Sequence, residues 1–196
     1  KQLSVDLEVI PCIGLERDMI FPEMKQIFSI PSPNIPNWET AILYPGTCLI
    51  EGTNLSEGRG TSRPFTWFGA PYIDQEELCD ALSKLNPEGI ELRPQGFIPT
   101  YSKHEGEHCK GVSIEIMHPK YVRPVRFMVE AIDVIRNLYP EDFEFLNAGK
   151  STVAFIDRLM GKEFTQNQDW DPHYFRYNEK KSIEEFKART KNILIY

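Results

Sequence analysis

Two carboxylates and two guanidiniums fall within thirteen residues of one loop-like stretch of the chain. Glu51 and Glu57 supply the carboxylates, and Arg59 and Arg63 supply the guanidiniums. Glycines between them permit backbone conformations that other residues avoid, which lets a ligand approach closely. This composition suits a polar, oxygen-rich ligand, and it equally suits a solvated loop held by a structural Arg–Glu pair. The short polar side chains of the stretch are Asn54, Ser56 and Thr61.

Paired carboxylates are what glycoside hydrolysis generally requires, one as the acid and the other as nucleophile or base. Glu51 and Glu57 are therefore the candidate catalytic residues, with a salt bridge to a nearby arginine as the alternative role for each. Arg59 and Arg63 suit an anionic ligand, because a guanidinium binds a carboxylate through two parallel hydrogen bonds. Either arginine could instead be held by a glutamate or a carbonyl of the loop itself.

A second polar segment spans residues 100–110, between two predicted strands. Loops at strand ends gather in clefts, so Lys103 and Glu107 are candidate ligand contacts. Trp67 is a candidate to stack on a sugar ring, although packing is the reading that we favour. We expect no metal site, because the residues of ligand type in this segment match no standard spacing. They are His104, Glu105, Glu107, His108 and Cys109.

Composition excludes several classes of function. The 196 residues are 41% hydrophobic and 26% charged, which is ordinary for a globular domain. A net charge of −7 argues against nucleic-acid binding, which needs a basic face. The four cysteines are spaced too widely for a metal knuckle or a dense disulfide scaffold, so we expect buried thiols, with one disulfide as the alternative. No nucleotide-binding or esterase motif is present, and no cofactor is implied.

Periodicity, capping residues and turn signals predict the elements that position these side chains. Prolines exclude a regular helix or an inner strand from residues 20–36. The predicted fold class is α/β (α+β mixed), a layered domain with a small mixed sheet and about four to five helices. Strands are predicted at 7–10, 48–50, 90–99 and 111–117, and helices at 37–43, 74–85, 124–139, 151–160 and 182–191.

Several motifs occur in the same order as in a known family. They are PSPNIP at 31–36, YPG at 44–46, EGTNLSEGRGT at 51–61, RPF at 63–65, GAP at 69–71, FIPT at 97–100, SK at 102–103 and RPVR at 123–126. This pattern closely resembles the signature of the exo-β-N-acetylmuramidase (NamZ) family, formerly a bacterial domain of unknown function. The resemblance covers nearly the whole chain and is most specific between Pro31 and Asp74.

The resemblance implies a glycoside hydrolase that releases terminal N-acetylmuramic acid from peptidoglycan fragments during cell-wall turnover and recycling. It implies two subdomains with the active site between them. The N-terminal, Rossmann-like subdomain is the expected partner and is thought to supply the main catalytic carboxylate. Because family members are about twice as long, residues 1–30 would be the end of that subdomain and the crossover, and residues 31–196 the C-terminal subdomain. A periplasmic or secreted location is favoured, with no membrane span.

The expected substrate-binding residues combine this resemblance with the side-chain chemistry. Arg59 and Arg63 would bind the lactyl carboxylate that distinguishes muramic acid from N-acetylglucosamine. The alternative function is a non-catalytic binding module for acidic amino sugars or peptidoglycan fragments. A third reading is an interaction domain that docks through the proline-rich segment from Ile20 to Pro36. The remaining expected contacts are Asn54, Ser56, Thr61 and Lys103.

Overall fold

The computed structural model describes residues 5–149, 153–161, 170 and 172–195. Its α-helices are α1 (Trp38–Thr47), α2 (Gln75–Ser83), α3 (Pro124–Leu138), α4 (Phe155–Met160) and α5 (Pro172–Thr190). Its strands are β1 (Trp67–Ala70), β2 (Ile90–Phe97) and β3 (Cys109–Ile116). Short 3₁₀ helices are η1 (Phe21–Met24), η2 (Cys48–Gly52) and η3 (Pro119–Tyr121). No helix in the described residues is long and apolar enough to cross a membrane.

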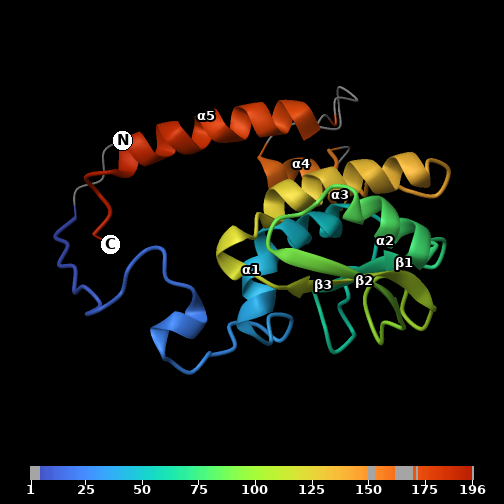
Figure 1. Ribbon diagram of the computed structural model, residues 1–196, viewed down its shortest axis with the longest axis horizontal. Coiled ribbons are helices and arrows are strands. Elements are labelled where there is room, and N and C mark those ends of the chain that lie inside the picture. Colours follow the sequence, from blue (N-terminus) through green and yellow to red (C-terminus); the bar gives the residue numbers. More distant parts are fainter. Residues whose placement is uncertain (1–4, 150–152, 162–169, 171, 196) are drawn as a thin grey trace.

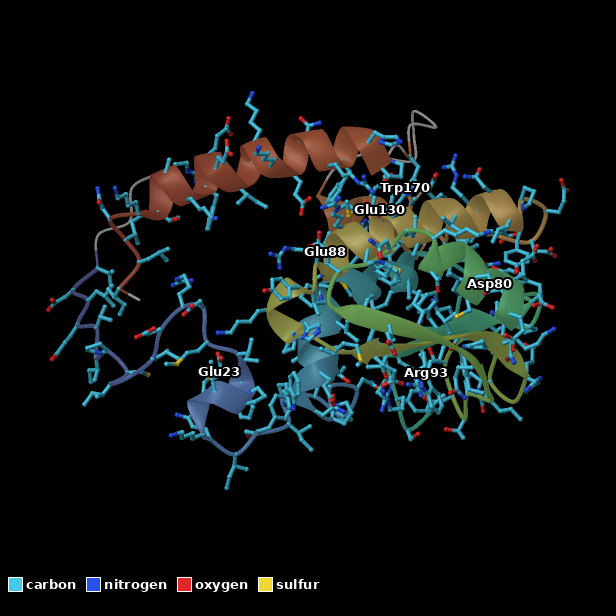
Figure 2. The ribbon with its side chains drawn as sticks, viewed as in Figure 1. Glu23, Asp80, Glu88, Arg93, Glu130 and Trp170 are labelled. Carbon is cyan, nitrogen blue, oxygen red and sulfur yellow. The ribbon has the colours of Figure 1, made fainter. Side chains whose placement is uncertain are left out.

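The three strands form one sheet in the order β1-β3-β2, with both pairings antiparallel. Successive side chains of a strand point to opposite faces, so β3 directs Val112 and Ile114 toward the helices, where both are buried. The helices cover this face of the sheet, and Arg93 lies on the other side from Glu130 of α3 (Figures 1 and 2). The predicted mixed α/β layered class is confirmed.

Helices α2 and α3 begin where their sequence signals predict. Asp74 caps α2 because its Oδ1 accepts hydrogen bonds from the backbone N–H groups of Glu76 and Glu77, each at 3.0 Å. Pro124 opens α3, where its missing N–H is not needed. The buried face of α3 follows the predicted helical spacing and includes Phe127, Met128, Ala131, Ile132 and Ile135. Both helices end slightly earlier than predicted.

Two predicted strands are wrong. Residues 7–10 form no strand and are exposed. Residues 48–50 belong to the 3₁₀ helix η2, because α1 continues through Pro45 to Thr47 instead of ending at residue 43. Tertiary packing outweighs the proline, since Gly46 lies against the start of α3: a Cβ there would be 2.0 Å from the Pro124 carbonyl oxygen. Leu49 and Ile50 are nevertheless buried in the hydrophobic core.

The C-terminal helices differ in length from the prediction. Helix α4 begins at Phe155 and not at 151, and residues 151 and 152 lie outside the described residues. Gly161 ends α4 in a left-handed conformation, as predicted. Helix α5 begins ten residues earlier than predicted, packs against α3 and extends past it (Figure 1). Strand β1 was not predicted, because four residues between turns carry too little periodicity to detect.

Two of the four cysteines are buried thiols, as expected. Cys79 and Cys109 are buried, Cys48 is half-buried and Cys12 is exposed. Burial raises the pKa of the Cys109 thiol to about 11 from an ordinary value of 9.0, and Glu107 adds to the shift. The unfolded chain therefore releases this proton at lower pH than the folded chain does. Cys109 stabilises the fold below pH 9, and this contribution is lost as the pH rises through about 11.

We predict that Cys109→Ala removes a pH-dependent part of stability. Between pH 9 and 11 the wild-type free energy of unfolding should lose about 2 kcal/mol that the variant does not lose, measured by urea unfolding. Val112→Ala is the matched control, because it also shortens a fully buried side chain of β3 but removes no titrating group. Parallel pH profiles for the wild type and Cys109→Ala would contradict the assignment.

Candidate functional site

The loop after η2 is held rigidly against its surroundings. Ser56 forms an isolated antiparallel bridge with Gly69 of β1, with backbone hydrogen bonds of 2.8 and 3.1 Å. Gly60 has φ = +77°, and a Cβ there would lie 2.7 Å from the Thr100 backbone nitrogen. The Thr100 N–H donates to the Gly60 carbonyl at 2.9 Å. This close approach requires glycine and joins the loop to the β2–β3 connection.

Glu57 lies at the centre of the loop and is only 2% exposed. Its Oε1 is 3.2 Å from Arg59 Nε, and its Oε2 is 2.8 Å from Lys103 Nζ. Both contacts are close ion pairs, but neither Glu57 Oε2 nor Arg59 Nε completes a well-aligned hydrogen bond in the described residues. A buried carboxylate is stable only when cations compensate for its lost hydration. Arg59 and Lys103 therefore make the burial of Glu57 tolerable.

Lys103 joins the two polar segments of the sequence. Its Nζ donates to the carbonyls of Ile50 and Thr53, each at 2.9 Å, besides its contact with Glu57. Burial lowers the pKa of the Lys103 ammonium, while the charges of Glu57 and Glu51 act in the opposite direction. Ile50 lies in η2 and Thr53 directly follows it, so the Lys103 side chain holds the junction between η2 and the loop in place.

Arg59 is fixed by two carboxylates and an aromatic ring. Its Nη2 donates to Glu51 Oε1 at 3.0 Å, and its guanidinium carbon lies 5.1 Å from the centre of the Phe65 ring. Phe65 has φ = +60°, an uncommon conformation for a bulky residue, and Tyr44 packs edge-on against its ring at 4.9 Å. Strained residues of this kind gather at functional sites. The Arg59 side chain is still 31% exposed and the Glu51 side chain 21%.

Other predicted site residues hold the loop together. Asn54 donates to the Asp142 carbonyl and accepts from Tyr72 and from the Glu144 N–H. Ser56 Oγ accepts from the Gly58 N–H. Thr61 Oγ1 donates to the Gly58 carbonyl at 2.6 Å and accepts from the Arg63 N–H. These are turn contacts typical of short polar side chains.

Glu51, Glu57, Arg59 and Lys103 are called the Glu57 cluster. Within the described residues, the Arg63 side chain forms no hydrogen bond or ion pair with this cluster. Its Nη2 donates to Glu115 Oε2 at 3.0 Å, and its Nε donates to Thr66. Glu115 lies on the face of β3 that points away from the helices. The two arginines of the loop therefore pair with different carboxylates, Arg59 with Glu51 and Glu57 and Arg63 with Glu115. Trp67 packs near Phe97, with ring centres 6.1 Å apart.

The structure thus brings together Glu51, Glu57, Arg59 and Lys103. Sequence reasoning missed Phe65 and Tyr44, whose only signal was their place inside the matched motifs, and Glu115, which gave none. His104 Nε2 donates to the Asn54 carbonyl, 2.7 Å away, and its Nδ1 lies 3.5 Å from Glu107 Oε1. Among the described residues, no group of three histidine, cysteine or acidic side chains is placed to hold a metal ion.

We predict that Lys103→Met destabilises the fold, because it leaves Glu57 buried with one cation. The free energy of unfolding should fall by roughly 2 kcal/mol. Lys84→Met, at an exposed position, should change it little. The double variant Glu57→Gln/Lys103→Met should recover most of the loss. Urea unfolding of all four proteins tests this; equal losses in Lys103→Met and in the double variant would show that the uncompensated charge of Glu57 does not cause the loss.

Comparison with known proteins places this geometry in a family. Residues 42–196 match the family described as "Exo-beta-N-acetylmuramidase NamZ, C-terminal". The chain is 36% identical to the peptidoglycan β-N-acetylmuramidase NamZ of Bacillus subtilis (strain 168), over 99% of this chain and 46% of that protein. It therefore spans about half the length of this curated relative.

Two crystal structures of DUF1343 family proteins from Bacteroides fragilis NCTC 9343 share the fold. One has a TM-score of 0.82 and 24% identity, covering 93% of this chain and 49% of the other. The second has a TM-score of 0.54 and 24% identity, covering 85% and 43%. The match to the family model extends over most of the sequence and includes the whole Glu57 cluster. The chain belongs to the exo-β-N-acetylmuramidase NamZ family and corresponds to its C-terminal part.

Proposed function

We propose that this chain forms one wall of the active-site cleft of a β-N-acetylmuramidase that releases terminal N-acetylmuramic acid from peptidoglycan fragments. The observation that carries the proposal is the Glu57 cluster, in which a buried carboxylate fixes one arginine and one lysine. In the part of the chain that the structure describes, buried Glu57 Oε2 and Arg59 Nε lack aligned hydrogen-bond partners. Most buried polar atoms in folded proteins have hydrogen-bond partners, so each exception calls for an explanation, and a catalytic role is one of them.

The two glutamates take different roles in this proposal. Glu51 reaches solvent and contacts Arg59 through a single oxygen, so it is the carboxylate of this pair that a substrate can meet. Glu57 is enclosed, and it orients Arg59 and Lys103 instead of transferring a proton itself. The N-terminal, Rossmann-like subdomain found in the family would supply the principal catalytic carboxylate opposite Glu51.

Arg59 recognises the lactyl carboxylate of N-acetylmuramic acid. Its guanidinium is partly exposed, fixed by Glu51 and Glu57, and therefore pre-organised for an anion. Arg63 would contribute from the sheet side, where Glu115 holds it. Thr61, which is half-buried, would bond a sugar hydroxyl or the N-acetyl group. Asn54, Ser56 and Lys103 would maintain the shape of the binding loop.

We further propose the division of the longer protein. Residues 1–30 would form the end of the N-terminal subdomain and the crossover, and residues 31–196 would form the C-terminal subdomain. The match to about half of the Bacillus subtilis protein supports this arrangement. The two partners of this wall are then a peptidoglycan-derived amino sugar and the N-terminal subdomain of the same protein.

A non-catalytic binding module for acidic amino sugars is the second candidate. The observation that favours it is the compensation of Glu57 by two cations, which suits recognition better than proton transfer. The two candidates differ in turnover. A two-subdomain protein that carries this sequence releases N-acetylmuramic acid from muropeptides under the first proposal and only binds it under the second.

We predict that Arg59→Ala separates recognition of the two amino sugars. In the two-subdomain protein, the dissociation constant for N-acetylmuramic acid should rise roughly tenfold or more, because a charge-assisted contact is lost. The dissociation constant for N-acetylglucosamine should change much less, since it lacks the lactyl carboxylate. Isothermal titration calorimetry measures both.

Arg93→Ala is the matched control for this experiment. Its side chain is 69% exposed, and in the described residues its nearest carboxylate is that of Glu91, 3.9 Å away. This variant should leave both dissociation constants unchanged. If Arg59→Ala weakens the binding of both sugars equally, Arg59 does not bind the lactyl carboxylate. The turnover experiment would still show whether the protein is an enzyme.

A further inference from the structure

A hollow lies on the helix side of the sheet, apart from the Glu57 cluster. It is enclosed by α1, the turn between α2 and β2, the start of α3 and one residue of α5. Its cavity volume is about 60 Å³, and its mouth is open to solvent. None of its lining residues belongs to the group formed by Glu51, Glu57, Arg59 and Lys103. Its floor is apolar and consists of the buried side chains Leu43, Ile90, Ile114, Val122 and Phe127.

The mouth of this hollow carries an excess of positive charge. Arg123, Arg126 and Arg176 line it together with the carboxylates of Glu88 and Glu130. Glu130 Oε1 accepts from Arg126 Nε at 3.3 Å and also from Arg176, so both of these guanidiniums are paired with a carboxylate, although the three residues keep one net positive charge. Figure 2 shows Glu130 on α3 below α5, with Glu88 nearby.

Arg123 differs from the other two arginines. Its Nη1 donates to the carbonyls of Lys120 and Val122, both at 3.1 Å, and within the described residues no carboxylate contacts it. Those two carbonyls fix the direction of the side chain without neutralising its charge. Arg123 immediately precedes α3, whose N-terminal end adds a partial positive charge at the same place.

The wall of the hollow is firmly positioned. A Cβ on Gly46 of α1 would lie 2.0 Å from the Pro124 carbonyl oxygen and 2.8 Å from the Val125 nitrogen, so α1 and α3 meet without room to spare. Thr47 lines the hollow, but its hydroxyl donates to the Leu43 carbonyl, 3.1 Å away. The RPVR motif at 123–126, which the Glu57 cluster does not use, is thereby built into this mouth.

We propose that this hollow binds an amphipathic monocarboxylate, with its chain on the apolar floor and its carboxylate on Arg123. The apolar floor excludes a fully polar ligand such as a sugar, because its hydroxyls would lose hydration without gaining partners. The uncompensated guanidinium selects an anion over a neutral chain. Three guanidiniums against two carboxylates leave one positive charge at the mouth, which one carboxylate balances. The site is separate from the proposed muramidase site and does not depend on it.

Titration of the ¹⁵N-labelled protein with sodium octanoate, kept below its micelle-forming concentration, tests the proposal by NMR. We expect saturable shifts of the amide signals of residues 122, 123 and 125–127, and of Ile90 and Ile114. Octan-1-ol, which has the same chain without the charge, should bind roughly tenfold more weakly. Arg123→Ala should weaken the binding of octanoate by a similar factor and leave the binding of octan-1-ol unchanged. This side chain is exposed, so the variant is expected to fold.

Arg93→Ala, on the other side of the sheet, is the matched control and should not change octanoate binding. Leu85→Trp should obstruct the mouth and weaken both ligands, because Leu85 lines the hollow. The proposal is overturned if octanoate causes no saturable shifts, if Arg123→Ala and Arg93→Ala behave alike, or if the shifts fall on the exposed apolar residues of α5, such as Ile183 and Phe186, instead.

Discussion

The burial of the Glu57 carboxylate is the constraint on which the rest of the binding loop depends. An ionised side chain with 2% exposure needs compensating charge, and the fold supplies it from two separate segments of the chain. Arg59 comes from the same loop, and Lys103 comes from the connection between β2 and β3. The position of the loop therefore depends on the β2–β3 connection, which supplies Lys103.

The surrounding elements explain why the cluster is stiff. The β2–β3 connection is anchored by a long antiparallel pairing, and its Thr100 and Lys103 bond the loop and the end of η2. Below Arg59, a buried Phe65 in a left-handed conformation supports the guanidinium and rests on Tyr44 of α1. Helix α1 in turn is held on α3 by the contact at Gly46. A pre-organised cation of this kind loses little entropy on binding an anion.

The sequence predicted the parts of the fold that local chemistry controls. Asp74 at the start of α2 and Pro124 at the start of α3 act through their own backbone neighbours, so their effects can be read directly. The continuation of α1 through Pro45 could not be predicted, because it depends on a contact with a helix nearly eighty residues away. The motifs gave the members of the Glu57 cluster, but not the pairing of Arg63 with Glu115, which depends on the register of the sheet.

We propose that this chain carries the part of the site that binds the lactyl carboxylate of N-acetylmuramic acid. The most direct measurement is an NMR titration of the two-subdomain protein, labelled with ¹⁵N on its arginine side chains, with N-acetylmuramic acid and with N-acetylglucosamine. The Arg59 Nε–H signal should shift saturably with N-acetylmuramic acid and stay in place with N-acetylglucosamine. An Arg59 signal that responds equally to both sugars, or to neither, would contradict the proposal.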